Sequence, residues 1–268
     1  MTDKSLISTR GLSRRRALQA GIVGGTALWV APTVESLYTP AAAASNTGPC
    51  AGAAQTIDWS TFPTNGAPGA GGFPYTVGTF GGTIVTFELI AAGSLVWGTG
   101  ESGVQTAAQS GNFTGIFQLY KNLAPIGDTT VLRIRFNKVV KNLSFRITDI
   151  DLANTGGNNF VDQVKVEPFL NGVAQSGTFT PDTVPNPPCG GFFQPACTAP
   201  SFTPNSASTG TTTTRTGTAP AASNSATGNL RVQQTAGVDR VDLTYISNQP
   251  SGTGTTQAIG ITNISWSC

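Results

Sequence analysis

Histidine is absent from all 268 residues of this chain. Without an imidazole, the chain cannot build a Ser-His-Asp or Cys-His catalytic group, a His-ligated zinc site, or the usual proton shuttle near neutral pH. The nucleophile motif Gly-x-Ser-x-Gly is also missing. The sequence therefore predicts a protein that is not an enzyme.

Charge is scarce as well, because only 10% of the residues are Asp, Glu, Lys or Arg. The formal net charge of +2 includes five basic residues within the first 16 positions. Beyond position 44 the chain carries ten basic and eleven acidic residues, a net charge of −1. A chain this close to neutral lacks the basic surface that binds nucleic acid, so we expect no nucleic-acid partner.

No apolar run is long enough to anchor the chain in a membrane. The longest run near the N-terminus, 20–31, has about a dozen residues and ends before Pro32, whereas a spanning helix needs about 20. Three arginines precede this run and four alanines at 41–44 follow it, an order typical of an export signal. We expect residues 1–44 to be cleaved and 45–268 to form one secreted domain without a transmembrane anchor.

The arginine pair Arg14 and Arg15 resembles the twin-arginine signal of bacterial proteins that are exported already folded. The match covers Ser13, Arg14, Arg15 and Leu18 and departs at Ala17 and Gln19. The resemblance implies the twin-arginine export machinery as a partner. The alternative is a general secretory signal that happens to contain three arginines.

Only four cysteines are present. In an oxidising compartment we expect them to pair, and four cysteines allow three connectivities. Cys189 and Cys197 enclose a short loop that a disulfide closes easily, which leaves Cys50 and Cys268 near the two ends of the exported chain. We predict these two bridges, and the second requires the first and last strands to be neighbours.

Apolar residues at every second position are the main pattern that the chain does contain. Leu132, Ile134 and Phe136 alternate with polar residues, and the pattern returns in 143–148, which predicts two half-buried strands joined as an antiparallel hairpin across 137–142. Other segments that read as strands are 83–90, 94–97, 113–120, 164–166, 177–180, 230–232, 241–245 and 259–264. With about nine to eleven strands, the sequence predicts an all-β, antiparallel two-sheet β-sandwich.

Residues 181–226 differ in composition, because Pro, Thr, Ser, Ala and Gly dominate them. We expect a mobile, loop-rich insertion here. Within it Phe192 and Phe193 lie on the loop between two cysteines. They are candidates for contact with a sugar or a partner surface, and burial against the sandwich is the alternative.

Oxygen-bearing side chains follow the segment 143–148 closely. They are Asp149, Asp151, Asn154, Asn158, Asn159 and Asp162. Calcium takes six to eight oxygen ligands, often from one loop, so the segment is a candidate for a structural Ca²⁺ site, although its spacing is not that of an EF-hand. The alternative is that Asp149 pairs with Arg133 or Arg146 while the asparagines build turns.

The run 136–151, with its Asn-Leu-Ser-Phe strand and terminal Asp-Ile-Asp, and Asp162 before a Val-x-Val strand resemble a module of bacterial secreted and surface proteins. That module is similar to jelly-roll and galactose-binding-like sandwiches. The resemblance implies an exported, non-catalytic domain, jelly-roll-like in fold, with a bound calcium ion.

Three classes of function remain open. The first is a structural or adhesion protein outside the cell, which fits the lack of catalytic groups. The second is a carbohydrate-binding module whose partner is a polysaccharide. The third is a glycoside hydrolase that uses only carboxylates, because Asp149 and Asp151 on a strand would share one face.

Overall fold

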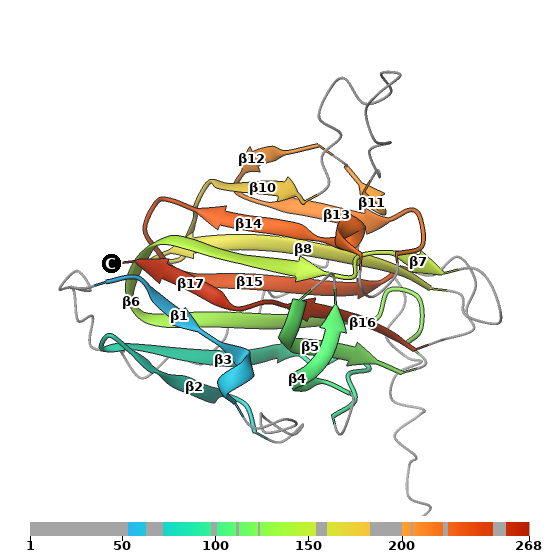
Figure 1. Ribbon diagram of the computed structural model, residues 1–268. Coiled ribbons are helices and arrows are strands. Elements are labelled where there is room, and N and C mark those ends of the chain that lie inside the picture. Colours follow the sequence, from blue (N-terminus) through green and yellow to red (C-terminus); the bar gives the residue numbers. More distant parts are fainter. Residues whose placement is uncertain are drawn as a thin grey trace, which may run out of the picture. The chain divides into compact units, whose positions relative to one another are not determined.

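The computed structural model describes residues 53–62, 72–97, 101–110, 113–122, 124–153, 160–182, 200–204, 206–221, 225–248 and 256–267 (Figure 1). In these ranges the chain is all-β, and its named strands pair antiparallel, as the alternating sequence predicts. Two 3-10 turns, η1 (Trp59–Thr61) and η2 (Ala226–Gly228), are the helical elements of this part of the chain. No helix here has the length and apolar character needed to cross a membrane.

The strands are β1 (Gln55–Ile57), β2 (Tyr75–Phe80), β3 (Thr83–Ala91), β4 (Gly103–Ser110), β5 (Phe113–Lys121), β6 (Thr129–Thr148), β7 (Leu152–Ala153), β8 (Phe160–Leu170), β9 (Val173–Ala174), β10 (Gly177–Pro181), β11 (Phe202–Thr203), β12 (Ser208–Gly210), β13 (Thr213–Gly217), β14 (Leu230–Gln234), β15 (Val238–Ser247), β16 (Gln257–Ile261) and β17 (Ile264–Ser267).

The predicted central hairpin is wrong, because both of its segments belong to the single strand β6 of 20 residues. The connection 137–142 contains no glycine or proline, and Val140 within it is buried and pairs with Val238 of β15. Asn142 adopts φ of 49°, a left-handed conformation that asparagine tolerates. Figure 1 shows β6 as one ribbon that bends and runs back. The polar residues at 137 and 142 therefore mark a bend within a strand.

Each half of β6 has its own strand neighbours. The first half pairs with β3 and β15; β2 lies beyond β3, and β8, β13 and β11 extend the ladder beyond β15. The second half pairs with β14, β16 and β17. Beyond these, β10 pairs with β14 and β12 with β10, while β5 pairs with β16 and β4 with β5. On β17, the outer neighbour is β1. Two ladders thus share one strand.

The hydrophobic core takes its side chains from both ladders. Phe87 of β3 and Phe117 of β5 meet edge to face with ring centroids 5.0 Å apart, and Trp59 of η1 packs against both rings. At the bend of β6, Phe136 packs against Trp266 of β17. Aromatic pairs of this kind contribute about 0.5 to 1.5 kcal/mol beyond their buried area. Trp59 therefore joins β3 to β5, and Trp266 packs β17 against the bend of β6.

Two further segments differ from the predicted strands. Residues 94–97 form only isolated bridges, through Leu95 and Trp97. Conversely, the Thr-rich run inside 181–226 is regular: β13 pairs with β8, with Thr213 opposite Val166. Thr213 and Arg215 are buried. The second half of the segment 181–226, which the composition predicts to be a mobile insertion, therefore forms part of a ladder. Asn171 and Gly172, a residue pair typical of hairpin turns, form the turn between β8 and β9, and both adopt positive φ.

Candidate functional site

Asp149 and Asp151 lie just beyond the end of β6, in a short segment held by backbone contacts. Asp149 has φ of 67°, which ends the extended conformation. Ile150 between them is fully buried; its N–H donates to the carbonyl of Gly228, and its carbonyl accepts from Ser201 Oγ at 2.7 Å. The two aspartates are therefore not on a strand, and the sequence-based expectation that they share a strand face is wrong.

Asp162 reaches the same place from β8. Its N–H donates to the carbonyl of Asp151 at 2.9 Å, next to the β7–β8 pairing that places Leu152 opposite Val161. On the other side, Gly217 approaches so closely that any Cβ would overlap the carbonyl of Asp151. These contacts fix the backbone of the acidic segment, so the positions of the three carboxylates follow from the fold.

The carboxyl group of Asp162 is fully buried. Its Oδ1 accepts a hydrogen bond from Tyr245 Oη at 2.7 Å, whereas Oδ2 has no donor among the described residues. The carboxyl groups of Asp151 and Asp162 are close enough to hydrogen-bond, but two ionised carboxylates cannot do so without a proton or a cation between them. Asp162 thus brings an uncompensated buried oxygen to the cluster.

A cavity of about 250 Å³ opens beside this cluster. Its lining residues are Tyr120, Asp149, Asp151, Phe160, Ala221, Thr256, Gln257 and Ala258. Gln257 is buried; its Nε2 donates to Ser247 Oγ at 2.6 Å, and its Oε1 has no donor in the described part of the chain. The polar atoms left without partners around the cavity are therefore acceptor oxygens.

The three carboxyl groups hold their protons far more tightly than exposed aspartates do. Burial raises the pKa of Asp149 to about 7, and the charge of Asp151 adds to the rise. Burial also raises the pKa of Asp151 to about 6, although the N–H of Ala221, 2.8 Å from Oδ2, opposes this rise. The pKa of Asp162 lies well above its usual range through burial and the charge of Asp151. Ionising all three requires a compensating positive charge.

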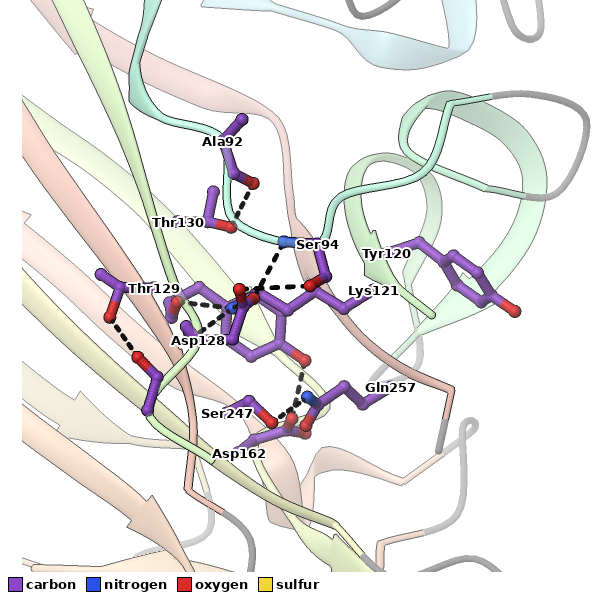
Figure 2. A network of polar contacts seen from close by, with 12 residues as sticks. Ala92, Ser94, Tyr120, Lys121, Asp128, Thr129, Thr130, Asp162, Ser247 and Gln257 are labelled. Atoms are coloured by element: carbon purple, nitrogen blue, oxygen red, sulfur yellow. Dashed lines mark hydrogen bonds and ion pairs between the residues drawn. The ribbon is translucent and has the colours of Figure 1, made fainter. Parts of the chain in front are cut away.

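Behind the acidic cluster, Tyr245 connects Asp162 to a buried ion pair between Lys121 and Asp128. Figure 2 shows this ion pair in one network with Asp162, Ser247 and Gln257. Lys121 Nζ lies 2.9 Å from Asp128 Oδ2 and donates to the carbonyls of Asp128 and Tyr245. It also lies 4.6 Å from the centroid of the Tyr245 ring. Burial lowers the pKa of Lys121, which Asp128 partly offsets. This ammonium therefore forms its salt bridge with Asp128; it acts on Asp162 only through the longer-range charge interaction, and among the described residues no salt bridge joins it to Asp149 or Asp151.

The arginines proposed as alternative partners of Asp149 are engaged elsewhere. Arg133 pairs with Asp242 at 2.8 Å and Arg146 with Asp182 at 2.7 Å. Among the described residues, no salt bridge joins a basic side chain to Asp149. The alternative of a simple arginine pair is thus not the arrangement that the chain adopts.

The structure brings together the three aspartates that the sequence singled out, but it describes only part of the predicted site. Asn154, Asn158 and Asn159 lie outside the described residues. Within the described ranges, no group of three acidic, histidine or cysteine side chains is found that could hold a metal ion by itself. The sequence did not reveal Tyr245, Lys121 or Gln257. Tyr245 meets Asp162 from 83 positions away and Lys121 meets the Tyr245 carbonyl from 124 positions away, so these contacts depend on how distant strands pair.

Several other candidate residues cannot be placed. Phe192 and Phe193, the export arginines Arg14 and Arg15, and all four cysteines lie outside the described residues. One premise of the Cys50–Cys268 bridge is nevertheless confirmed: β1 pairs with β17, with Gln55 opposite Trp266. The first and last described strands are therefore neighbours.

Comparison of the chain with protein-family models, with curated proteins and with solved structures gives no match.

Proposed function

We propose that this chain is an exported, non-catalytic bacterial β-sandwich protein with a structural or adhesive role outside the cell, and that its acidic cavity holds a structural Ca²⁺ ion. The observation that carries the ion site is Asp162, a fully buried carboxyl group whose Oδ2 has no donor among the described residues and which neighbours two more carboxyl groups. Ionising a buried carboxyl group is costly, and a divalent cation bound beside it would offset that cost.

Calcium suits the chemistry of this cavity better than a transition metal does. The cavity lining offers the carboxylate oxygens of Asp149 and Asp151 and the amide oxygen of Gln257, and Asp162 adjoins Asp151 behind the lining. The sequence offers no imidazole. Hard cations prefer such an all-oxygen set. Asn154 and Asn158, on the connection between β7 and β8, would complete the set. The ion would then tie the end of β6 to β8.

Saturating calcium should raise the melting temperature of the exported chain, residues 45–268. At about 100 times the dissociation constant, binding to the folded state alone adds about 2.7 kcal/mol to the free energy of unfolding. At roughly 2 to 4 °C per kcal/mol for a domain of this size, the expected rise is about 5 to 10 °C. Differential scanning calorimetry with calcium and then with chelator measures it.

The matched variants are Asp151→Asn at the cavity and Asp239→Asn on β15, where Asp239 accepts a hydrogen bond from the N–H of Asn171 in the β8–β9 turn. Asp151→Asn should remove most of the calcium response, and Asp239→Asn should leave it intact. A melting temperature that is indifferent to both calcium and chelator would disprove the ion site.

Export is supported by the arginine pair in the sequence. Replacing Arg14 and Arg15 together by lysine should leave uncleaved precursor inside the cell, because the twin-arginine receptor recognises the two guanidinium groups. Immunoblots of cell and culture-medium fractions measure this. Undiminished secretion of the double variant would assign the chain to the general secretory route.

The two ladders share β6 and contribute to one core, which supports a two-sheet, jelly-roll-like sandwich for residues 45–268. The β1–β17 pairing supports a Cys50–Cys268 bridge, since Cys50 precedes β1 by five positions and Cys268 directly follows β17. The short Cys189–Cys197 bridge is proposed on sequence spacing alone.

A glycoside hydrolase that uses only carboxylates is the second candidate, favoured by the raised pKa values of Asp149 and Asp151 beside an open cavity. A carboxyl group that stays protonated near neutral pH can act as a general acid. A screen on polysaccharides, with Asp149→Asn as the control, separates the two functions: hydrolysis that this variant abolishes would favour the enzyme.

A further inference from the structure

A second cavity, of about 230 Å³, lies beside the second half of β6, and none of the three aspartates lines it. Its lining comes from β5, from the second half of β6, and from the β16–β17 connection together with β17. The lining residues are Phe113, Thr114, Gly115, Ser144, Phe145, Arg146, Thr262, Asn263 and Ser265. We call it the β5–β6 cavity. It contains none of the residues of the acidic cavity.

The start of β5 forms one wall because it leaves its partner strand there. β5 pairs with β16 only from Lys121 back to Phe117. Before that point Gly115 has φ of 69°, and a Cβ on it would lie 3.1 Å from the backbone nitrogen of Ser60. The strand thus bends over η1, and Phe113 reaches Arg146, whose guanidinium carbon lies 5.0 Å from the centre of the Phe113 ring.

Two guanidinium groups beside this cavity share one carboxylate. Arg146 Nε donates to Asp182 Oδ2 at 2.7 Å, and Arg231 Nη2 donates to Asp182 Oδ1 at 3.3 Å. Asp58 is a second carboxylate close to the lining, since its Oδ1 accepts hydrogen bonds from Ser60 and Asn263, so the charges of the four groups balance. Among the described residues the Arg146 side chain donates only to Asp182, which leaves its terminal N–H groups to bind an anionic ligand.

The remaining lining is polar and partly in contact with solvent. Thr114 is exposed, and Ser144 and Ser265 are half-buried. Their hydroxyl groups can both donate and accept hydrogen bonds. An aromatic ring next to hydroxyls and a guanidinium group suits a pyranose, whose C–H face packs on the ring while its hydroxyls and carboxylate bind the polar groups. The volume is below the range of about 300 to 1,000 Å³ that is usual for drug-sized ligands, so it fits one sugar unit.

We propose that the β5–β6 cavity binds one uronic-acid unit of an acidic polysaccharide, with Phe113 packing on the sugar ring and Arg146 binding its carboxylate. The inference is independent of the calcium site, because the two cavities share no residue. It gives an extracellular protein a defined surface for attachment to an acidic glycan.

The test titrates the exported chain with short oligomers of galacturonic acid, and with galactose oligomers of equal length as neutral probes. Backbone-amide NMR shifts locate the contact and calorimetry gives the affinity. We expect the acidic oligomer to shift the amides of residues 113–115 and 144–146 and to bind at least about tenfold more tightly than the neutral one.

Three variants make the test specific. Phe113→Ala should weaken binding about tenfold, and Arg146→Gln about 10- to 100-fold, as expected for loss of a charge-assisted hydrogen bond. Arg133→Gln is the matched control, because Arg133 also pairs with an aspartate and is similarly exposed, but it lies in the other half of β6; it should leave binding unchanged. An unaltered amide spectrum outside the substituted site verifies that each variant is folded.

Three results would overturn the proposal. The first is that no saccharide shifts these amides at millimolar concentration. The second is binding that neither Phe113→Ala nor Arg146→Gln weakens. The third is that an Asp- and Glu-rich peptide binds as tightly as the uronic-acid oligomer, which would show a site for carboxylates in general. Asp151→Asn, which tests the calcium site, should not change glycan binding, so the two proposals fail separately.

Discussion

Replacing Lys121 by alanine should lower the free energy of unfolding by about 3 to 5 kcal/mol, because the change removes one partner of a buried ion pair. The Lys121 side chain is fully buried, and Asp128 is only 11% exposed. The substitution also leaves the carbonyls of Asp128 and Tyr245 without their donor and removes the ammonium group from the Tyr245 ring. Chemical denaturation monitored by tryptophan fluorescence gives the difference.

Lys165→Ala is the matched control for this prediction. Lys165 also pairs with a carboxylate, Glu167 at 2.9 Å, but its side chain is 39% exposed, and exposed pairs contribute about 0 to 1 kcal/mol. Equal losses for the two variants would mean that burial of Lys121 contributes nothing. The double variant Lys121→Met, Asp128→Asn should recover part of the loss, since it removes both charges together.

Without calcium, the stability of the chain should fall as the pH rises from about 4 to about 7. Asp149 and Asp151 have a pKa of about 7 and about 6 in the folded state, against 3.8 as the ordinary value. Between these values the folded state retains protons that the unfolded state has lost, so each rise in pH favours unfolding. One pKa unit corresponds to about 1.4 kcal/mol, and the total effect is of the order of a few kcal/mol.

The measurement compares melting temperatures in chelator at pH 4.5 and 7.5 for residues 45–268 and for the double variant Asp149→Asn, Asp151→Asn. The other charged groups that face the cluster, Asp162, Tyr245 and Lys121, remain in both proteins. The variant should lose less stability than the parent between the two pH values. Saturating calcium should reverse the trend in the parent, because the ion binds the ionised carboxylates. Parallel curves in chelator would show that the cluster does not titrate in this range.

Local pattern was enough to predict most strands, because their stabilising residues are close in sequence. The alternation of Leu132, Ile134 and Phe136 is a local signal and corresponds to the first half of β6. The adjacent residues Asn171 and Gly172 are another, and they form the turn between β8 and β9. The sequence predicts a turn at the bend of β6, because a hairpin turn and a bend within a strand both place a short polar segment between two alternating ones. Which of the two forms depends on β15, whose Val238 pairs with Val140 from far along the chain.

The candidate site divides in the same way. The closeness of Asp149, Asp151 and Asp162 follows from their positions on either side of one loop. The burial of Asp162 does not follow from local sequence, because it depends on Tyr245 of β15 and Gln257 of β16. The β5–β6 cavity has no sequence signature at all, since it exists only where β5 leaves β16 and Phe113 meets Arg146.

Because β6 belongs to both ladders, its strand pairing cannot be completed until the last strands of the chain have been synthesised. Asn142 of β6 donates to Ser267, which follows it by 125 residues, and at about 5 to 20 residues per second the ribosome needs roughly 6 to 25 seconds to make that stretch. During this interval the second half of β6 has neither β16 nor β17 at its edge, and open strand edges promote aggregation. Pairing at the second half of β6 therefore competes with aggregation for that interval, whatever happens to the chain afterwards.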